Sequence, residues 1–481
     1  MTAALRRSLT SLEVPNYRRY FAGQLISVSG NWTQVVAEMW LILTLTGSGV
    51  AAGLVSALQF LPILLFGAWG GLLADRVAKR RLLVVTQLLM ALPALALFGV
   101  TAPGVVAPWM VFALVFARGA VNAVDNPTRQ SFAIEIVGPD RIVNAVGLNS
   151  VLIHAARIVG PAVAGGLILT VGVAPCFLVN ALSFGAMVVA LRGMDPVQLQ
   201  PSVPAAREPG GVRAAFAYVR RTPALAIPLA MMAVVGTLGF NFQTILPLLA
   251  RFSFDGGAAA YAALAVAMGV GSVLGALATG ARSRIGPRVL TGAAAAFGAA
   301  ALVASMAPTL ALEAALLVPL GAASVSFAAS VNSTLQLSAA PQMRGRVMAL
   351  YAMVFLGSTP IGGPLVGWLA EVWGPRTGLV LSGAAALSAA AGARIAFARF
   401  RHHEAHDEPT DRQVRDRIRA HGRDAGDRRR VRREGRAGPG HAGTAHRAGH
   451  ERVRDRGHVA GAPDAEGDEA VPRHGHDPVA R

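Results

Sequence analysis

Long apolar runs, separated by short breaks that carry charge, glycine or proline, make up residues 1–400 and constrain the fold more than any other feature. A helix needs about 20 mostly apolar residues to cross a bilayer, because backbone polar groups find no water in the hydrocarbon core. Runs of this length lie at approximately 20–45, 50–74, 82–100, 105–126, 148–170, 174–192, 224–250, 258–280, 288–306, 310–332, 346–370 and 376–398. The sequence therefore predicts an all-α polytopic membrane protein with twelve transmembrane helices in a lipid bilayer.

Charge supports this prediction and gives an orientation. Residues 1–400 hold only 26 Lys and Arg and 11 Asp and Glu, whereas roughly a quarter of the residues in a soluble domain are charged. Of the 26 basic residues, 22 lie in segments that share a side of the membrane with the N-terminus. Because cytoplasmic loops carry the excess of Lys and Arg, we expect both termini in the cytoplasm and the protein in the cytoplasmic (inner) membrane.

Several classes of function are disfavoured by residues that occur once. Of the net charge of +18, +15 belongs to residues 1–400, where it is distributed mainly over the loops, and +3 belongs to residues 401–481, so the charge does not indicate a nucleic-acid partner. Lys79 is the only lysine and follows Ala78, which rules out a phosphate-binding GxxxxGK[ST] loop. Cys176 is the only cysteine, which we expect to be buried, and His154 is the only histidine before residue 401. We therefore expect no enzyme activity, no metal site and no cofactor.

The spans fall into two sets of six. A longer polar stretch, residues 193–222, separates an N-terminal half (1–192) from a C-terminal half (223–400), and we expect a short basic helix around Gly211–Arg221 within it. Two parallel six-helix repeats are typical of transporters.

A local repeat relates the two halves. The segment that begins at Arg141, RIVNAVGLNSVLIHAARIVGPAVAGG, aligns with the segment that begins at Arg344, RGRVMALYAMVFLGSTPIGGPLVG. The alignment places Gly160-Pro161 on Gly363-Pro364. The alternative is that Gly-Pro pairs recur by chance in a chain with 53 glycines and 28 prolines.

The loop between the second and third spans reads GLLADRVAKRR, Gly71–Arg81. It resembles the signature loop of the major facilitator superfamily, G-x-L-A-D-R-x-G-[KR]-[KR], with Ala78 in place of the second glycine. The resemblance implies the major facilitator fold. It also implies a cluster of charged residues that stabilises one conformation of the transporter, and the residues of this chain that match the signature there are Gly71, Asp75, Arg76, Lys79 and Arg80. The alternative is that these charges only set the topology.

The fifth span contains RIVGPAVAGG, Arg157–Gly166, which resembles the antiporter signature of the same superfamily. Pro161 lacks a backbone N–H and bends a helix, and Gly160 allows a neighbouring helix to approach. The resemblance implies export in exchange for protons, whereas a structural kink without bearing on direction is the alternative. The segments 30–48 and 118–132 are similar to the bacterial subgroup that includes the enterobactin exporter and drug exporters.

Polar side chains inside spans are costly, at about 2.5–3.5 kcal/mol for a charge at the helix centre, so they usually face a cavity or a partner. In the first span, Ser27, Asn31, Gln34 and Glu38 are spaced to share one helix face. Glu38 is the only carboxylate well within a first-half span, and we expect it to couple transport to protons. The alternatives are that it is an inert partner of Arg118 or Arg157, or that it lies at the outer interface. We expect Asp125 to join Asp75 and the basic loop.

A central substrate cavity is expected between the halves. The residues that we expect to line it are Asn31, Gln34, Arg118, Asn122, Arg157, Asn241 and Gln243, with Ser326 and Ser330 as further candidates. His154 fits a structural role better than a site, and the run GVGSVLG, Gly269–Gly275, is typical of close helix packing.

Residues 401–481 lack leucine, phenylalanine, tyrosine, tryptophan, methionine and lysine, and they contain ten of the eleven histidines. This composition predicts a disordered cytoplasmic tail. Neither its arginines nor its histidines show a spacing specific for nucleic acid or metal. A second interpretation is that the tail is the out-of-frame translation of a GC-rich gene, which resequencing of the locus would test.

Together these features predict a secondary active transporter that works as a monomer by alternating access. We expect a proton-coupled exporter of a small, partly hydrophobic, drug-like or siderophore-like molecule. An importer or facilitator of the same fold is the alternative, and a non-transporting membrane receptor or scaffold is a third.

Overall fold

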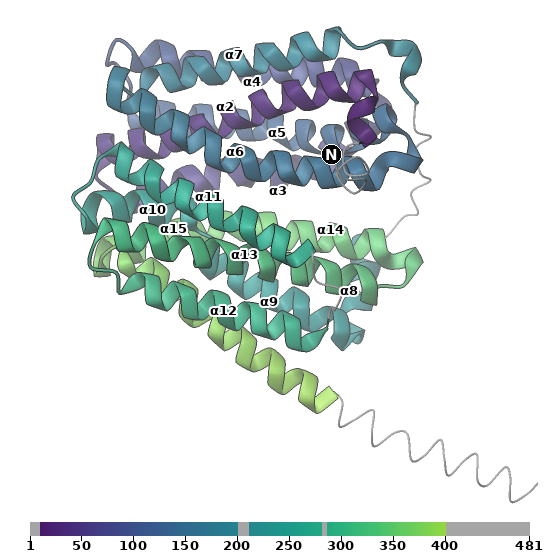
Figure 1. Cartoon of the computed structure of the whole chain (residues 1–481), viewed down its shortest axis with the longest axis vertical. Helices are drawn as coiled ribbons and strands as arrows, with labels where there is room; N and C mark the ends of the chain where they lie inside the picture. Colours follow the sequence, from purple (N-terminus) through teal and green to yellow (C-terminus); the bar gives the residue numbers. More distant parts are fainter. Residues whose placement is uncertain (1–9, 201–210, 281–285, 401–481) are drawn as a thin grey trace, which may run out of the picture. The chain divides into compact units, whose positions relative to one another are not determined.

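The computed structural model describes residues 10–200, 211–280 and 286–400, and within these residues every regular element is a helix (Figure 1). The chain divides into the units Met1–Asp407 and Glu408–Arg481. The predictions for the tail fall outside the described residues.

The N-terminal half contains six long helices. In chain order they are α2 Pro15–Thr46, α3 Gly49–Arg76, α4 Lys79–Thr101, α5 Pro108–Val137, α6 Ile142–Val171 and α7 Ala174–Arg192. Three short 3-10 helices, Thr10–Glu13, Pro139–Arg141 and Pro196–Gln198, flank them. A helix lies at each of the six apolar runs of this half, and most of the helices extend beyond the runs by several residues.

The C-terminal half begins after α8, Gly211–Arg221, which confirms the short basic helix expected there. Its helices are α9 Pro223–Gly239, α10 Phe242–Leu248, a π-helix Leu249–Ser253, α11 Ala258–Gly280, α12 Pro287–Ser305, α13 Leu310–Ser338, α14 Pro341–Gly357, α15 Thr359–Trp373 and Arg376–Phe400. Two predicted spans are therefore interrupted, one at Phe240-Asn241 and the other at Ser358.

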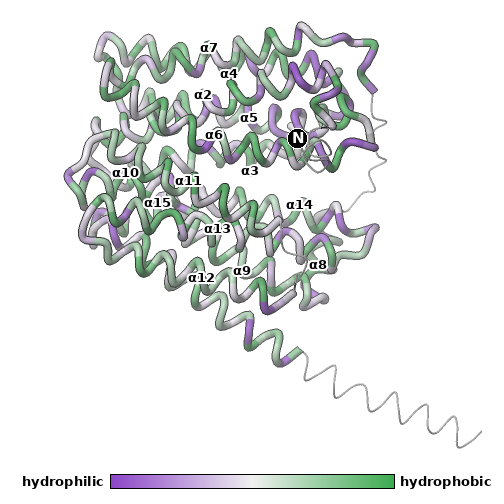
Figure 2. Tube along the Cα trace, in the orientation of Figure 1, coloured by the Kyte–Doolittle hydropathy of each residue, from purple (hydrophilic) through white to green (hydrophobic). Residues whose placement is uncertain are grey.

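Ten helices in the described part of the chain are long and apolar enough to cross a membrane. The two remaining long helices, α2 and α5, contain buried polar and charged residues, among them Glu38 and Arg118. These side chains lower the hydropathy of the two helices. Large apolar side chains such as Leu92, Leu169 and Leu277 are exposed on the helix surfaces, and hydrophobic residues predominate along most of the long helices (Figure 2). Such surfaces suit contact with lipid.

The helices pack mainly within their own half of the sequence. Helix α2 packs on α6 and α7, and α4 packs on α5 and α7, whereas α13 packs on α9, α11 and α12 (Figure 1). Two extensive contacts join the halves: α3 lies against α15, and α6 lies against α11.

Glycines permit the closest of these contacts. A Cβ atom on Gly271 would lie 2.0 Å from the carbonyl oxygen of Val318, and one on Gly275 would lie 2.3 Å from that of Ala322. This geometry confirms that the run Gly269–Gly275 serves close packing, here of α11 on α13. Cys176 is fully buried, as expected.

Candidate functional site

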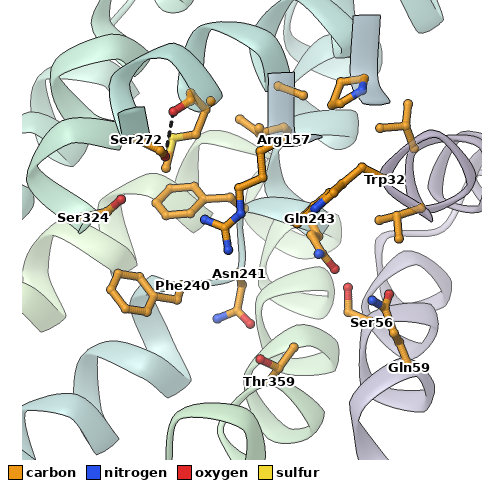
Figure 3. A pocket seen from close by; sticks show the side chains of 18 of the residues that line it. Trp32, Ser56, Gln59, Arg157, Phe240, Asn241, Gln243, Ser272, Ser324 and Thr359 are labelled. Carbon is orange, nitrogen blue, oxygen red and sulfur yellow. Dashed lines mark hydrogen bonds between the residues drawn. The ribbon is translucent and has the colours of Figure 1, made fainter. Parts of the chain in front are cut away.

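A cavity of about 410 Å³ lies where the two interrupted helices meet α2, α3, α6, α11 and α13. The breaks place Phe240, Asn241, Phe242 and Gln243 on one part of its wall, and Thr359, just after the break at Ser358, on another (Figure 3). A non-helical backbone inside a membrane protein is found where it lines a cavity. The remaining wall is Asn31, Trp32, Val35, Val36, Ser56, Gln59, Phe60, Asn122, Arg157, Pro161, Leu246, Tyr261, Ala265, Met268, Gly269, Ser272, Ser324, Val325, Ala328, Phe355 and Leu356.

Five of the seven residues expected at the cavity lie on its wall; they are Asn31, Asn122, Arg157, Asn241 and Gln243. The other two, Gln34 and Arg118, contact Glu38. On α13 it is Ser324 that lines the cavity, whereas the buried Ser326 hydroxyl contacts Thr279.

Glu38 sits at the centre of a buried polar network next to the cavity. Its Oε2 lies 2.6 Å from Nη2 of Arg118, and both side chains are almost fully buried. Its Oε1 accepts a hydrogen bond of 2.7 Å from Nε2 of Gln34, whose Oε1 accepts one of 2.5 Å from Asn180 on α7. Nη1 of Arg118 donates to Oδ1 of Asn31 at 2.8 Å, and Asn31 lines the cavity. The network therefore connects the cavity wall to the carboxylate.

Asp125 forms a second buried network, on the same helix as Arg118. It accepts hydrogen bonds from Oγ1 of Thr86 at 2.6 Å and from Nε2 of Gln87 at 2.8 Å, and it pairs with Arg129 one turn further along α5. Asp125 thus ties α4 to α5.

The loop after α3 holds its basic residues against the N-terminal half. Nζ of Lys79 lies 2.5 Å from Oε1 of Glu135, and Arg80 donates to the carbonyl oxygens of Leu191 and Arg192. Asp75 and Arg76 end α3 and are exposed, and Gly71 is partly buried on the same helix. Ala78 has φ −55° and ψ 112°, a conformation that alanine adopts without strain, so the turn does not need the glycine of the family pattern.

Reversal of the Lys79 charge is expected to destabilise the protein by about 1–3 kcal/mol, because Lys79→Glu would place two carboxylates in a contact that is 90% buried. Combining it with Glu135→Lys should recover at least half of the loss in thermal unfolding measurements. Arg81→Glu is the matched control, since Arg81 is exposed in the same first turn of α4. A double variant no more stable than Lys79→Glu would show that the pair is not an energetic unit.

The kink residues Gly160 and Pro161 lie where α6 crosses α2. A Cβ on Gly160 would lie 2.4 Å from Cβ of Trp32, and the Gly160 carbonyl accepts a hydrogen bond from Thr33. Pro161 lines the cavity. The Gly-Pro pair therefore shapes the wall on which Arg157 and Trp32 lie.

The contact between the halves is closest where α3 begins and α15 ends. A Cβ on Gly53 would lie 2.3 Å from the carbonyl oxygen of Gly363, and one on Gly49 would lie 2.4 Å from that of Gly367. Oε2 of Glu371 accepts hydrogen bonds of 3.1 Å from the Ser48 hydroxyl and the Val50 amide, so it caps the N-terminus of α3 from the other half.

Several of these residues were not expected from the sequence. Gln59 is an amide inside an apolar run, which is a usable signal, and the same holds for Asn180 in the sixth run. Glu135 and Glu371 lie near the ends of runs, where a charge is unremarkable, so their cross-helix contacts left no signal in the sequence.

Comparisons with known proteins agree with this architecture. The family described as transmembrane secretion effector matches residues 7–421. Among solved structures, the nucleoside transporter NupG superposes with a TM-score of 0.62 at 15% identity, covering 79% of this chain and 99% of NupG. A bacterial homologue of the human lysosomal transporter Spinster, solved in an inward-facing and unoccupied conformation, gives 0.62 at 14% identity over 79% of this chain and 97% of its own.

Curated relatives are more similar in sequence than these structures, at 27–28% identity. The staphyloferrin A transporter of Staphylococcus aureus is 27% identical over 49% of this chain and 60% of its own length. The multidrug efflux pump Tap of Mycolicibacterium fortuitum is 28% identical over 73% of this chain and 88% of its own. The macrolide efflux protein A of Streptococcus pyogenes is 27% identical over 30% of this chain and 36% of its own.

These matches confirm the resemblance read from the loop Gly71–Arg81, and they identify a multi-pass membrane transporter rather than an enzyme. The chain therefore belongs to the transmembrane secretion effector family of major facilitator superfamily transporters.

Proposed function

We propose that the protein is a proton-coupled exporter of a small, partly hydrophobic molecule. The observation that carries the proposal is the buried Glu38–Arg118 pair, which is linked through Asn31 to the wall of the cavity. A carboxylate held at this depth is a candidate proton site by default, and the efflux pumps among the relatives favour export.

In this proposal α2 and α5 also span the membrane, which gives twelve spans in two six-helix halves, 1–192 and 223–400, joined by the linker 193–222. The bias of basic residues toward the loops on the side of the N-terminus places both termini in the cytoplasm. The end at which Gly53 meets Gly363 then faces outward. Asp75, Arg76 and the rest of the signature loop face the cytoplasm, where they would contact the other half in the alternate conformation.

One chain contains the whole cavity, so we propose a functional monomer.

Flux measurements test the proposal. The protein is reconstituted into inside-out vesicles, an imposed inward-acid gradient drives uptake of fluorescent aromatic compounds from a panel with anionic, neutral and cationic members, and an uncoupler is added in a parallel sample. We expect gradient-driven uptake that the uncoupler abolishes. Uptake that persists with the uncoupler supports a facilitator, and uptake only in right-side-out vesicles supports an importer. The absence of flux of any compound from a broad panel would support a receptor or scaffold.

A further inference from the structure

The cavity wall carries one charged side chain, and that charge is positive. Among the described residues that line the cavity, Arg157 is the only ionic one; the others are apolar, amide, hydroxyl or thioether side chains. The nearby Glu38 carboxylate is already matched by Arg118, so the pair adds no net charge. The sign of the cavity is therefore set by Arg157.

The guanidinium of Arg157 has few partners in the described structure. Its Cζ lies 5.3 Å from the centroid of the Trp32 ring, over the ring face, and its buried Nε donates to no acceptor within the described residues. Figure 3 shows the guanidinium directed into the cavity, toward Phe240 and Asn241. The half-buried guanidinium faces the cavity without an anionic partner in the described structure, and its planar fork of donors matches the two oxygens of a carboxylate.

The backbone fixes Arg157 in this place. Pro161 has no N–H to donate to the Arg157 carbonyl in the helical i→i−4 pattern. Helix α11 approaches that carbonyl closely, since a Cβ on Gly269 would lie 3.0 Å from it. The side chain is thus presented from a tightly packed point of α6.

The rest of the wall indicates what accompanies the negative group. Aromatic rings line the same cavity, from Trp32 on α2, Phe60 on α3, Phe240 and Phe242 at the helix break, and Phe355 on α14. Rings of this kind favour a flat aromatic body over a flexible chain.

Amide groups add hydrogen-bonding capacity. The side-chain oxygens of Gln59, Asn241 and Gln243 are buried without a hydrogen-bond partner in the described structure. Buried polar atoms normally have hydrogen-bond partners, so a ligand with O–H or N–H groups would donate the hydrogen bonds that these oxygens lack. The volume of about 410 Å³ is within the range of pockets that take drug-sized molecules.

We propose that the cavity selects aromatic organic anions, with a carboxylate or similar group on Arg157, the ring system among Trp32, Phe240 and Phe355, and hydroxyl or amine hydrogens on the amides. This inference rests on the proposed transport function and names its substrate class. It predicts that anionic compounds bind better than neutral or cationic compounds of the same shape.

Binding of three matched probes tests the inference independently of transport. Naphthoate, naphthamide and naphthylmethylamine share one ring system and carry a negative, zero and positive charge at pH 7.5. Equilibrium dialysis against the protein in neutral-lipid nanodiscs, with empty nanodiscs subtracted, gives the three affinities. We expect naphthoate to bind about tenfold more tightly than naphthamide, as one charge-assisted hydrogen-bonded pair allows, and naphthylmethylamine to bind most weakly.

Variants assign the preference to one residue. Arg157→Gln should remove the preference for naphthoate, and Arg157→Lys should retain part of it. Arg251→Gln is the matched control, because Arg251 also lies over a tryptophan ring, that of Trp40 at 5.9 Å, but does not line the cavity. It should leave all three affinities unchanged.

The outcomes separate this inference from the proposed function. Equal binding of the three probes by the unaltered protein, or tighter binding of the cation, would overturn the anion selectivity even if gradient-driven flux is present. An anion preference that survives Arg157→Gln would overturn the assignment to Arg157. A naphthoate preference lost in Arg157→Gln would support the site even where no flux is found, and only the proposed export would then fail.

Discussion

Replacement of Glu38 by glutamine is expected to abolish proton-driven export and to leave membrane insertion intact. Glutamine keeps the shape of the side chain and can still contact Gln34, but it neither binds a proton in the useful pH range nor neutralises Arg118. Flux in inside-out vesicles under an acid gradient should fall to the level of protein-free vesicles. Surface expression and chromatographic behaviour, measured in parallel, report insertion.

The single substitution also leaves Arg118 buried without a counter-charge, which costs about 3–5 kcal/mol when a buried pair is broken. A stability defect must therefore be separated from a coupling defect. The double variant Glu38→Gln/Arg118→Gln replaces the ion pair by two amides and should restore thermal stability without restoring coupled flux. Its failure to recover stability would indicate that the pair holds α2 to α5 mainly as a structural element.

A carboxylate elsewhere in the protein provides the matched control. Glu313 on α13 is 1% exposed, against 0% for Glu38, and it does not line the cavity. Glu313→Gln should retain gradient-driven flux. Undiminished flux in Glu38→Gln would remove Glu38 from the coupling mechanism, whatever the behaviour of Glu313→Gln.

The sequence predicts the elements of this site better than their pairing. The spacing of Asn31, Gln34 and Glu38 places them on one helix face, and all three belong to one hydrogen-bonded network. The choice between Arg118 and Arg157 as the partner of Glu38 stayed open, because both lie at similar depth on different helices. It depends on how α5 and α6 rotate about their axes, and that rotation is set by packing over many residues.

For the fold, too, the sequence predicts the elements better than the details of their packing. Apolar runs locate the helices because each must bury its own backbone hydrogen bonds. The interruption at Phe240-Asn241 left no clear signal, since the surrounding run stays apolar and no proline adjoins the break. Pro360, in the first turn of α15, is a signal for the break at Ser358 that the length of the apolar run obscured. These interruptions place much of the cavity wall.

Replacement of Gly53 by valine is expected to force α3 and α15 apart and to reduce export at least tenfold. The carbonyl oxygen of Gly363 would lie 2.3 Å from the new Cβ, and Cα of Pro364 would lie 2.7 Å from it. Both are backbone atoms, so no side-chain rotation relieves the clash and the helices must separate. In the proposed orientation this contact closes the outer end, so the variant would favour the outward-open state and could not complete the cycle.

Spin labels at exposed positions Thr46 on α2 and Val372 on α15, in a Cys176→Ser background, would report the separation as a longer inter-label distance. Gly67→Val on the same helix is the control, because the nearest atom to its added Cβ is 3.8 Å away on Ile63, within α3 itself. It should change neither distance nor flux. If Gly53→Val kept the inter-label distance of the unaltered protein while flux fell, the prediction that α3 and α15 separate would be wrong. The loss of flux would then have to arise from a change inside the N-terminal half. A longer distance with normal flux would instead mean that closure at Gly53 and Gly363 is not a step of the transport cycle.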